Sequence, residues 1–407
     1  MPEEKEMPTR FVGLDVHKHY LVAAIVDADK NEIAPLRRVP FVQLDDWIRK
    51  SLTPRDAVVL EMTTNTWQLY DDLLPHVHSV TVVHPPNVAL ITRAHVMTDK
   101  IAARTLARLH AAGLLPAVWV PPADVRDHRA LIAQRSKMMR LATQARNRLH
   151  AVLHRHHILP PEGELFTAAM RSWWLELDIS VLERVRVQSD LATLQLAFEQ
   201  VDLLDKALAA LAAQDERAVL LVQLPGIGLT IAMTLLAAIG DVTRFPTANH
   251  LVGYAGLAGR VHDSGQTHRG GGITKAGRRD IRAAMVEAAH VASRFHPHWQ
   301  AELARLEPRL GRNKAIVAIA RKLLVAVWHV LTKGEADRHS TAEHTARKLL
   351  QHTYRLGREN RQGQSAGGYV RVQLDRLGIG ADLKGIPMSR QRAVSLPPSS
   401  LKEAAEN

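Results

Sequence analysis

Five short apolar segments among helical patterns, all within the first hundred residues, constrain this chain more than any other feature. They span residues 11–16, 20–26, 33–39, 57–61 and 79–83. Helical spacing of apolar residues occurs at 44–51, 67–74 and 98–109. Strands that first follow one another and then alternate with helices are typical of an α/β domain built on a mixed sheet. We therefore expect such a domain over residues 8–115.

The next region, residues 116–217, is helical and carries no strand signal. Apolar and small residues recur at heptad spacing within 131–152 and again within 194–211. Two heptad segments joined by roughly forty residues favour a long helical hairpin or coiled coil. Ordinary amphipathic core helices explain the same spacing equally well.

An uncharged run, residues 218–240, opens a second, mostly helical domain over 218–335. The run is long enough to cross a bilayer, but Pro225, Gly226 and Gly228 interrupt it, which favours a buried turn between two helices. The amides of such a turn can bind phosphate, as in helix–hairpin–helix DNA-binding elements, although a packed turn without a ligand is the alternative. We expect residues 336–407 to form a partly disordered extension, with a disordered tail from residue 397.

Charge is unevenly distributed along the chain. The formal net charge is +12. Residues 126–157 carry +7, residues 161–217 carry −6 and residues 260–322 carry +8. Clustered basic charge indicates a nucleic-acid partner, although a solvated helix face also explains the first cluster.

Two absences narrow the classes of function further. The chain has no cysteine, which excludes disulfides, thiolate zinc sites and cysteine nucleophiles. The first ten residues are charged and lack the apolar stretch of a secretory signal. We expect a cytoplasmic protein with no membrane partner.

Three acidic residues stand at the ends of expected elements in the first domain. Asp15 ends the first strand, Glu61 ends the fourth, and Asp99 begins the helix that follows the sheet. Carboxylates from separate elements can converge on hard divalent cations, and two such cations can promote phosphodiester cleavage. We therefore expect a metal site at these three residues. A plain helix N-cap is an equal alternative for Asp99.

A glycine-rich segment with a serine and several cations lies in the second domain. Ser264 could act as a nucleophile there, with neighbouring guanidinium groups stabilising the charge that develops. A loop serine without a catalytic role is the alternative. The expected nucleic-acid-binding cations are Arg260, Arg269, Lys275, Arg278 and Arg279.

Taken in order, these motifs resemble those of a known family. They are GLDVHK around Asp15, LEMTTNT around Glu61, TDK followed by ARTLA around Asp99, LPGIG, and GYAGLAGRVHDSG with ITKAGRRDIR around Ser264. The chain resembles the insertion-sequence transposases that carry a RuvC-like DEDD domain and a C-terminal transposase domain with a catalytic serine. These enzymes are described as bridge-RNA-guided recombinases.

The resemblance implies a fold, a chemistry and partners. The implied fold is an RNase H-like N-terminal domain, an intervening coiled coil and a helical transposase domain. Asp15, Glu61 and Asp99 match the first three acids of the family's metal-binding tetrad, and Ser264 matches the serine that attacks DNA. The implied cofactor is Mg²⁺ or Mn²⁺. The implied partners are DNA, a guide RNA encoded beside the gene, and further copies of the chain in a dimer or tetramer.

One position departs from the family pattern, TDxxDA. The fourth acid should stand three residues after Asp99, and Ala102 occupies that place. Residues three apart share a helix face, so the missing carboxylate would have faced the metal site. We interpret the chain as a DNA transposase that is disabled if position 102 is essential. The alternatives are a metal-dependent, structure-selective DNA nuclease and a non-catalytic nucleic-acid-binding protein.

Overall fold

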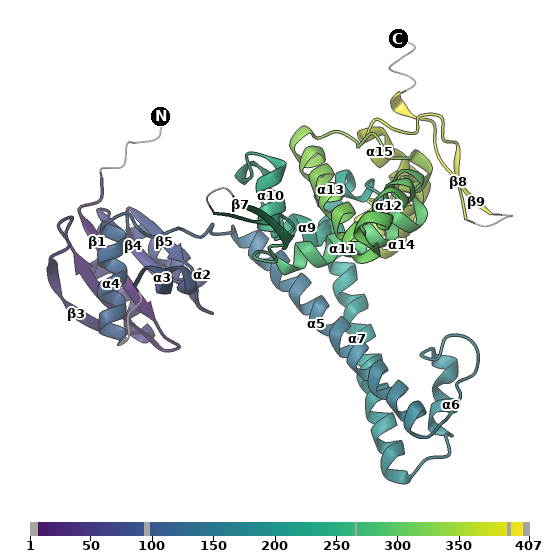
Figure 1. Cartoon of the computed structure of the whole chain (residues 1–407), viewed down its shortest axis with the longest axis horizontal. Coiled ribbons are helices and arrows are strands. Elements are labelled where there is room, and N and C mark those ends of the chain that lie inside the picture. Colours follow the sequence, from purple (N-terminus) through teal and green to yellow (C-terminus); the bar gives the residue numbers. More distant parts are fainter. Residues whose placement is uncertain (1–6, 93–97, 265–266, 389–391, 402–407) are drawn as a thin grey trace. The chain divides into compact units, whose positions relative to one another are not determined.

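The chain folds into two compact units, Met1–Pro122 and Ala123–Asn407. A computed structural model describes residues 7–92, 98–264, 267–388 and 392–401 (Figure 1). The first unit is built on a five-stranded sheet, and the second is almost entirely helical. This confirms the expected α/β domain followed by a mostly helical remainder.

The sheet of the first unit has the strand order β3-β2-β1-β4-β5. β1 and β2 pair antiparallel, as do β2 and β3, whereas β4 and β5 run parallel to β1. This mixed order is consistent with the expected RNase H-like domain. The strands are β1 (Arg10–Val16), β2 (Tyr20–Val26), β3 (Glu32–Pro40), β4 (Asp56–Glu61) and β5 (Ser79–Val83).

Helices cover both faces of the sheet. Trp47 of α1 and Leu69 of α2 pack with Leu14 and other inward residues of the central strands. On the opposite face, Ala103 of α4 packs against Val22 and its neighbours on β2. The helices of this unit are α1 (Leu44–Ser51), α2 (Thr66–Leu73), α3 (Pro85–Thr92) and α4 (Asp99–Ala111).

Gly13 determines how closely α4 approaches the sheet. A Cβ atom at Gly13 would lie 2.2 Å from the carbonyl oxygen of Ala103 and 2.5 Å from the amide nitrogen of Ala107. Only glycine fits such a contact, because real side chains do not tolerate these distances to backbone atoms. The close packing holds the first turn of α4 beside the end of β1, and this places Asp99 near Asp15.

The second unit contains a long antiparallel helical hairpin, made by α5 (Ala123–Arg155) and α7 (Val181–Gln214). Figure 1 shows the two helices side by side, with the short helix α6 (Arg171–Leu175) between them in sequence. Three ion pairs join the helices, Arg135 with Asp205, Arg148 with Asp190 and Arg155 with Glu183. The expected helical hairpin is confirmed.

The uncharged run of residues 218–240 forms two helices with a turn between them, as expected. Gly226 in the turn has φ +78°, and a Cβ there would lie 2.0 Å from the carbonyl oxygen of Ala288. The turn is therefore packed inside the core. The helices around it are α8 (Glu216–Val222), α9 (Leu229–Ile239), α10 (Ala248–Tyr254), α11 (Arg279–Phe295), α12 (Pro297–Leu310) and α13 (Arg312–Lys333).

Within the described ranges, α13 is the one helix long and apolar enough to cross a membrane by length and composition. One side of it, including Ile319, Leu323 and Val327, is fully buried in the core of the second unit. This burial is typical of a helix in a protein core and does not favour a membrane span.

The C-terminal part is more ordered than we expected from the sequence. It forms α14 (Ala342–Asn360), α15 (Ala366–Arg376) and a small sheet of β8 (Gly385–Pro387) and β9 (Ala393–Ser395). The expectation of a disordered tail from 397 is wrong for residues 397–401. There the Ser399 hydroxyl donates to Asp375 at 2.7 Å, and Arg371 donates to the carbonyl oxygen of Pro397 at 2.8 Å. Because this segment is held by polar contacts, its sequence lacks the apolar periodicity from which an ordered element could have been predicted. Residues 402–407 lie outside the described ranges.

His352 on α14 gives a testable pH dependence of stability. Burial, with a smaller contribution from the charge of Arg355, lowers its pKa from 6.5 to about 4, and its ring lies 6.2 Å from that of Tyr369. As pH falls, His352 is therefore protonated in the unfolded chain before it is protonated in the folded one. The free energy of unfolding is unaffected by protonation of this residue above pH 6.5 and decreases towards pH 4, by up to about 3 kcal/mol.

We expect His352→Leu to reduce the acid-induced loss of unfolding free energy, measured by urea denaturation at pH 7 and pH 4.5. His329→Leu removes an exposed histidine from α13 and should leave the loss unchanged. Equal losses in both variants would contradict a role for His352.

Candidate active site

Three side chains converge where β1 ends beside the first turn of α4. His17 follows Asp15 by two residues, and strand alternation places the two on one face. The Nε2 atom of His17 lies 3.3 Å from Asp15 Oδ2 and 3.2 Å from Asp99 Oδ2. One ligand atom from each of the three residues lies within 4.8 Å of the other two. The structure thus brings together two of the three expected acids and adds a histidine.

An aromatic stack supports this cluster from β2 and β3. The Tyr20 hydroxyl donates to Asp99 Oδ2 at 3.0 Å, and this bond is the main reason that the pKa of Tyr20 is raised. The Tyr20 ring stacks on His17 with centroids 4.5 Å apart, and the Arg38 guanidinium lies 3.8 Å over the Tyr20 ring. Both the imidazole and the Asp99 carboxylate are therefore held in position by Tyr20.

Glu61, the third expected acid, lies on the strand next to Asp15. Leu14 pairs with Leu60 across β1 and β4, so the residues that follow them are neighbours. Burial raises the pKa of Glu61, and the charge of Asp15 raises it further. Burial also raises the pKa of Asp15, against the opposing effect of His17. Glu61 is close enough to interact with Asp15 but lies outside the compact group of Asp15, His17 and Asp99.

Asp99 is not the N-cap of α4, which was the alternative to a role as a metal ligand. The N-cap of the helix is Thr98, whose side chain accepts a hydrogen bond from the amide of Ile101 at 3.4 Å. Asp99 is the first helical residue, and its carboxylate is directed to the cluster. Ala102 is half-buried in the same turn, three residues further on. A methyl group therefore stands where the expected fourth acid would begin.

The cluster fits a divalent cation. Asp15, Asp99 and the neighbouring Glu61 offer carboxylate oxygens, the ligands that Mg²⁺ and Mn²⁺ accept in proteins. Raised carboxyl pKa values in a partly buried group of like charges are typical of sites that a cation stabilises.

Ser264 lies in a β-hairpin rather than in the irregular loop that we expected. β6 (Gly259–Ser264) pairs antiparallel with β7 (Thr267–Ile273), and Ser264 is the partner of Thr267. The pairing depends on backbone hydrogen bonds, so the glycine-rich sequence shows little of the apolar alternation that marks a strand. The side chains of residues 261–270, which include Ser264 and Arg269, lie outside those that the structure describes.

The other expected cations differ in availability. Arg278 is paired with Asp280, with Nε 3.0 Å from Oδ1, and Arg260 donates to the carbonyl oxygen of Thr274 at 3.3 Å. Lys275 and Arg279 are exposed and line a groove of about 660 Å³. Among the expected cations whose side chains the structure describes, these two are therefore the freest to contact phosphate.

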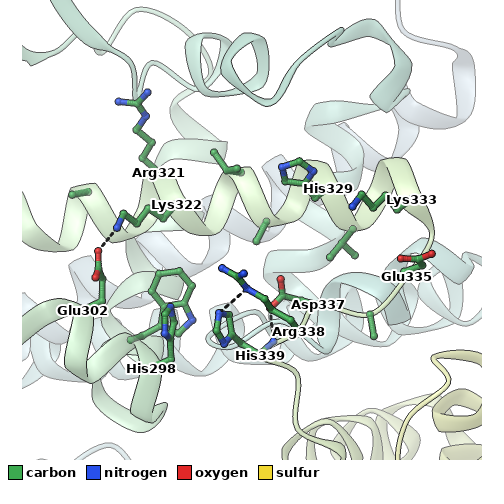
Figure 2. Close-up of a pocket in the computed structure, with 16 residues that line it drawn as sticks. His298, Glu302, Arg321, Lys322, His329, Lys333, Glu335, Asp337, Arg338 and His339 are labelled. Atoms are coloured by element: carbon green, nitrogen blue, oxygen red, sulfur yellow. Dashed lines mark hydrogen bonds and ion pairs between the residues drawn. The ribbon is translucent and has the colours of Figure 1, made fainter.

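A second cavity, of about 920 Å³, lies between α12, α13 and the connection after α13, and the sequence analysis did not predict it. Arg321, Lys333 and Arg338 line it together with Glu335 and Asp337, and no carboxylate in the described ranges forms an ion pair with these three cations (Figure 2). His298 stacks on His339 at its edge, with centroids 3.9 Å apart. Sequence reasoning missed this site because its residues come from three separate elements.

Comparison with known proteins gives two family matches. A model described as the transposase IS116/IS110/IS902 family matches residues 218–304. A second transposase model, that of the IS110-type DEDD domain, matches residues 12–158. The first match spans the hairpin with Ser264 and the second spans the acidic cluster.

Two individual proteins align over most of the chain, and a third aligns over part of it. The pilin gene-inverting protein of Moraxella bovis is 28% identical over 81% of this chain and 97% of its own length. The corresponding protein of Moraxella lacunata gives the same identity and coverage. The transposase for insertion sequence element IS1111A of Coxiella burnetii is 30% identical over 33% of this chain and 38% of its own.

Proposed function

We propose that the chain is a transposase of the IS110 family that cuts and rejoins DNA through Ser264, with metal-bound carboxylates and a guide RNA. The observation that carries the proposal is the convergence of Asp15 and Asp99 around His17, with Glu61 on the next strand. The charge of Asp99 contributes to raising the pKa of Asp15, and a bound cation would offset this repulsion between the two carboxylates.

The residues of the first unit would hold the cation. A bound divalent cation supplies stabilisation of the negative charge that develops on phosphate oxygens. Asp15, Glu61 and Asp99 provide oxygen ligands, and Tyr20 orients the Asp99 carboxylate through its hydroxyl. Ala102 leaves this set one carboxylate short.

Ser264 would supply the nucleophile from the second unit. Its hydroxyl oxygen forms a bond to phosphorus, the bond from phosphorus to the leaving sugar oxygen breaks, and the hydroxyl proton passes to that oxygen. Rejoining reverses the step with the hydroxyl of a new strand. Lys275 and Arg279 would hold the phosphate backbone near the hairpin, with Arg260, Arg269 and Arg278 as further contacts.

The guide RNA and the oligomer follow from the family resemblance. The basic stretches 126–157 and 260–322 are compatible with a second nucleic acid. The test is to purify the full chain together with its nucleic acid, sequence that nucleic acid and determine the mass of the complex. One discrete RNA and a dimer or tetramer are expected. A mixture of unrelated cellular RNAs would contradict guidance by a dedicated RNA.

Ala102 favours a second candidate, a nucleic-acid-binding protein without catalysis. A structure-selective nuclease remains a third reading, and it differs in leaving no protein attached to DNA. Assays on end-labelled DNA separate all three, because only the transposase forms a covalent protein–DNA link and only the nuclease cuts DNA without forming one.

Reversing two charges should weaken binding to nucleic acid. In Lys275→Glu/Arg279→Glu, two phosphate contacts are lost, so the slope of log K against log salt should fall in magnitude by about two. Arg186→Glu, which changes an exposed cation in the acidic stretch 161–217, is the matched control and should leave the slope unchanged. Salt titrations of DNA binding measure both variants. An unaltered slope in the double variant would show that Lys275 and Arg279 face solvent and do not contact the nucleic acid.

A further inference from the structure

We propose that His17 is a nitrogen ligand of the metal site and makes that site prefer cations that accept nitrogen, Mn²⁺ among them, over Mg²⁺. This inference rests on the proposed function, because it assumes that Asp15 and Asp99 hold a cation. It goes beyond a site made of carboxylates alone.

The geometry around His17 is that of neighbouring ligands. When metal–ligand distances are about 2.1 Å, adjacent ligand atoms of an octahedron lie about 3.0 Å apart. The His17 Nε2 atom lies 3.3 and 3.2 Å from one oxygen of Asp15 and one of Asp99. All three atoms therefore lie close to the spacing that they would have around one cation.

No described atom other than the two carboxylate oxygens competes with a cation for the His17 Nε2 atom. It is buried and makes no hydrogen bond of acceptable geometry with any described atom. A buried polar atom without a hydrogen bond carries a cost that a bound cation would remove. The nearest groups on both sides are carboxylate oxygens, so the atom faces the centre of the cluster.

The imidazole is also fixed before any cation binds. The His17 amide donates to the carbonyl oxygen of Tyr20 at 2.9 Å, and the Asn65 side chain donates to the carbonyl oxygen of His17 at 3.3 Å. The ring itself stacks on Tyr20. Ligands held in place by such surroundings lose little freedom on binding.

Ligand chemistry then determines which cation is preferred. Mg²⁺ takes oxygen ligands and dehydrates reluctantly, whereas imidazole favours transition metals. Ala102 removes one carboxylate oxygen on the α4 side, and His17 adds one nitrogen on the β1 side. The number of protein ligands is thereby restored, but the site becomes less suited to Mg²⁺.

The test uses full-length protein and Mn²⁺ as the probe. Mn²⁺ binding is followed by the loss of its free-ion electron paramagnetic resonance signal, and Mg²⁺ binding by competition. The wild type should bind Mn²⁺ at least about tenfold more tightly than Mg²⁺, with ¹⁴N modulation in the spin echo of the bound ion. His17→Ala should lower Mn²⁺ affinity about 10- to 100-fold, change Mg²⁺ affinity less than about threefold, and abolish the ¹⁴N modulation.

Two further variants make the outcome specific. His19→Ala removes an exposed histidine from the same turn and should change nothing. His17→Asp replaces the nitrogen by oxygen and should move the preference towards Mg²⁺, which covers the case in which the alanine variant folds poorly. An unchanged Mn²⁺ to Mg²⁺ ratio and persistent ¹⁴N modulation in both His17 variants would overturn this inference alone. A wild type that binds neither cation would overturn the proposed function with it.

Discussion

Replacing Ser264 by alanine is expected to abolish covalent protein–DNA adducts while DNA affinity stays within about threefold. A neutral hydroxyl adds little to binding beside several cations, but alanine has no oxygen that could attack phosphorus. Adducts are measured on denaturing gels with end-labelled DNA. The assay is run in an Ala102→Asp background, so that the expected fourth acid is present.

Thr267 provides the matched control for this experiment. It pairs with Ser264 across the hairpin and also carries a hydroxyl group. Thr267→Val should leave adduct formation intact. Adducts that survive in Ser264→Ala but disappear in Thr267→Val would move the nucleophile to the facing strand and contradict the assignment.

The Ala102→Asp protein should recombine DNA faster than the wild type by two or more orders of magnitude in Mg²⁺, about 3 kcal/mol in barrier height. The added carboxylate lies three residues after Asp99 on the same face of α4 and supplies a missing oxygen ligand. The fold should survive, because Gly13 contacts Ala103 and Ala107 rather than position 102, and because an acid in the first helical turn is favourable. Recombination of a plasmid that carries both DNA partners measures the rate.

Ile101→Asp separates a ligand effect from a charge effect. Position 101 is 38% exposed in the same helical turn, so this variant adds the same charge without reaching the cluster. It should leave the rate near that of the wild type. Equal rates for Ala102→Asp and wild type would show that position 102 is an ordinary helix position.

The sheet domain could be predicted closely because each strand is a short apolar segment. The segment predicted at 20–26 coincides with β2, and that at 79–83 with β5. The helices α1, α2 and α4 were equally clear from their spacing, whereas α3 was not predicted. By contrast, the hairpin of β6 and β7 and the contacts of residues 397–401 depend on backbone and polar interactions, which leave no apolar period in the sequence.

The candidate site could be predicted only in part. Asp15, Glu61 and Asp99 were expected to converge because each stands at the end of a separate element. His17 was missed, although its spacing of two from Asp15 already placed it on the same face. The support from Tyr20 could not be predicted, because it depends on a contact between residues 79 positions apart.

The most direct test of the account is the yield of covalent adduct when the metal site is altered. In the Ala102→Asp background, adduct formation on DNA is compared with and without divalent cations and with Asp15→Asn. The account predicts adducts only when cation, Asp15 and Ser264 are all present, with DNA binding retained in every case. Undiminished adduct in Asp15→Asn, or in the presence of a chelator, would contradict it.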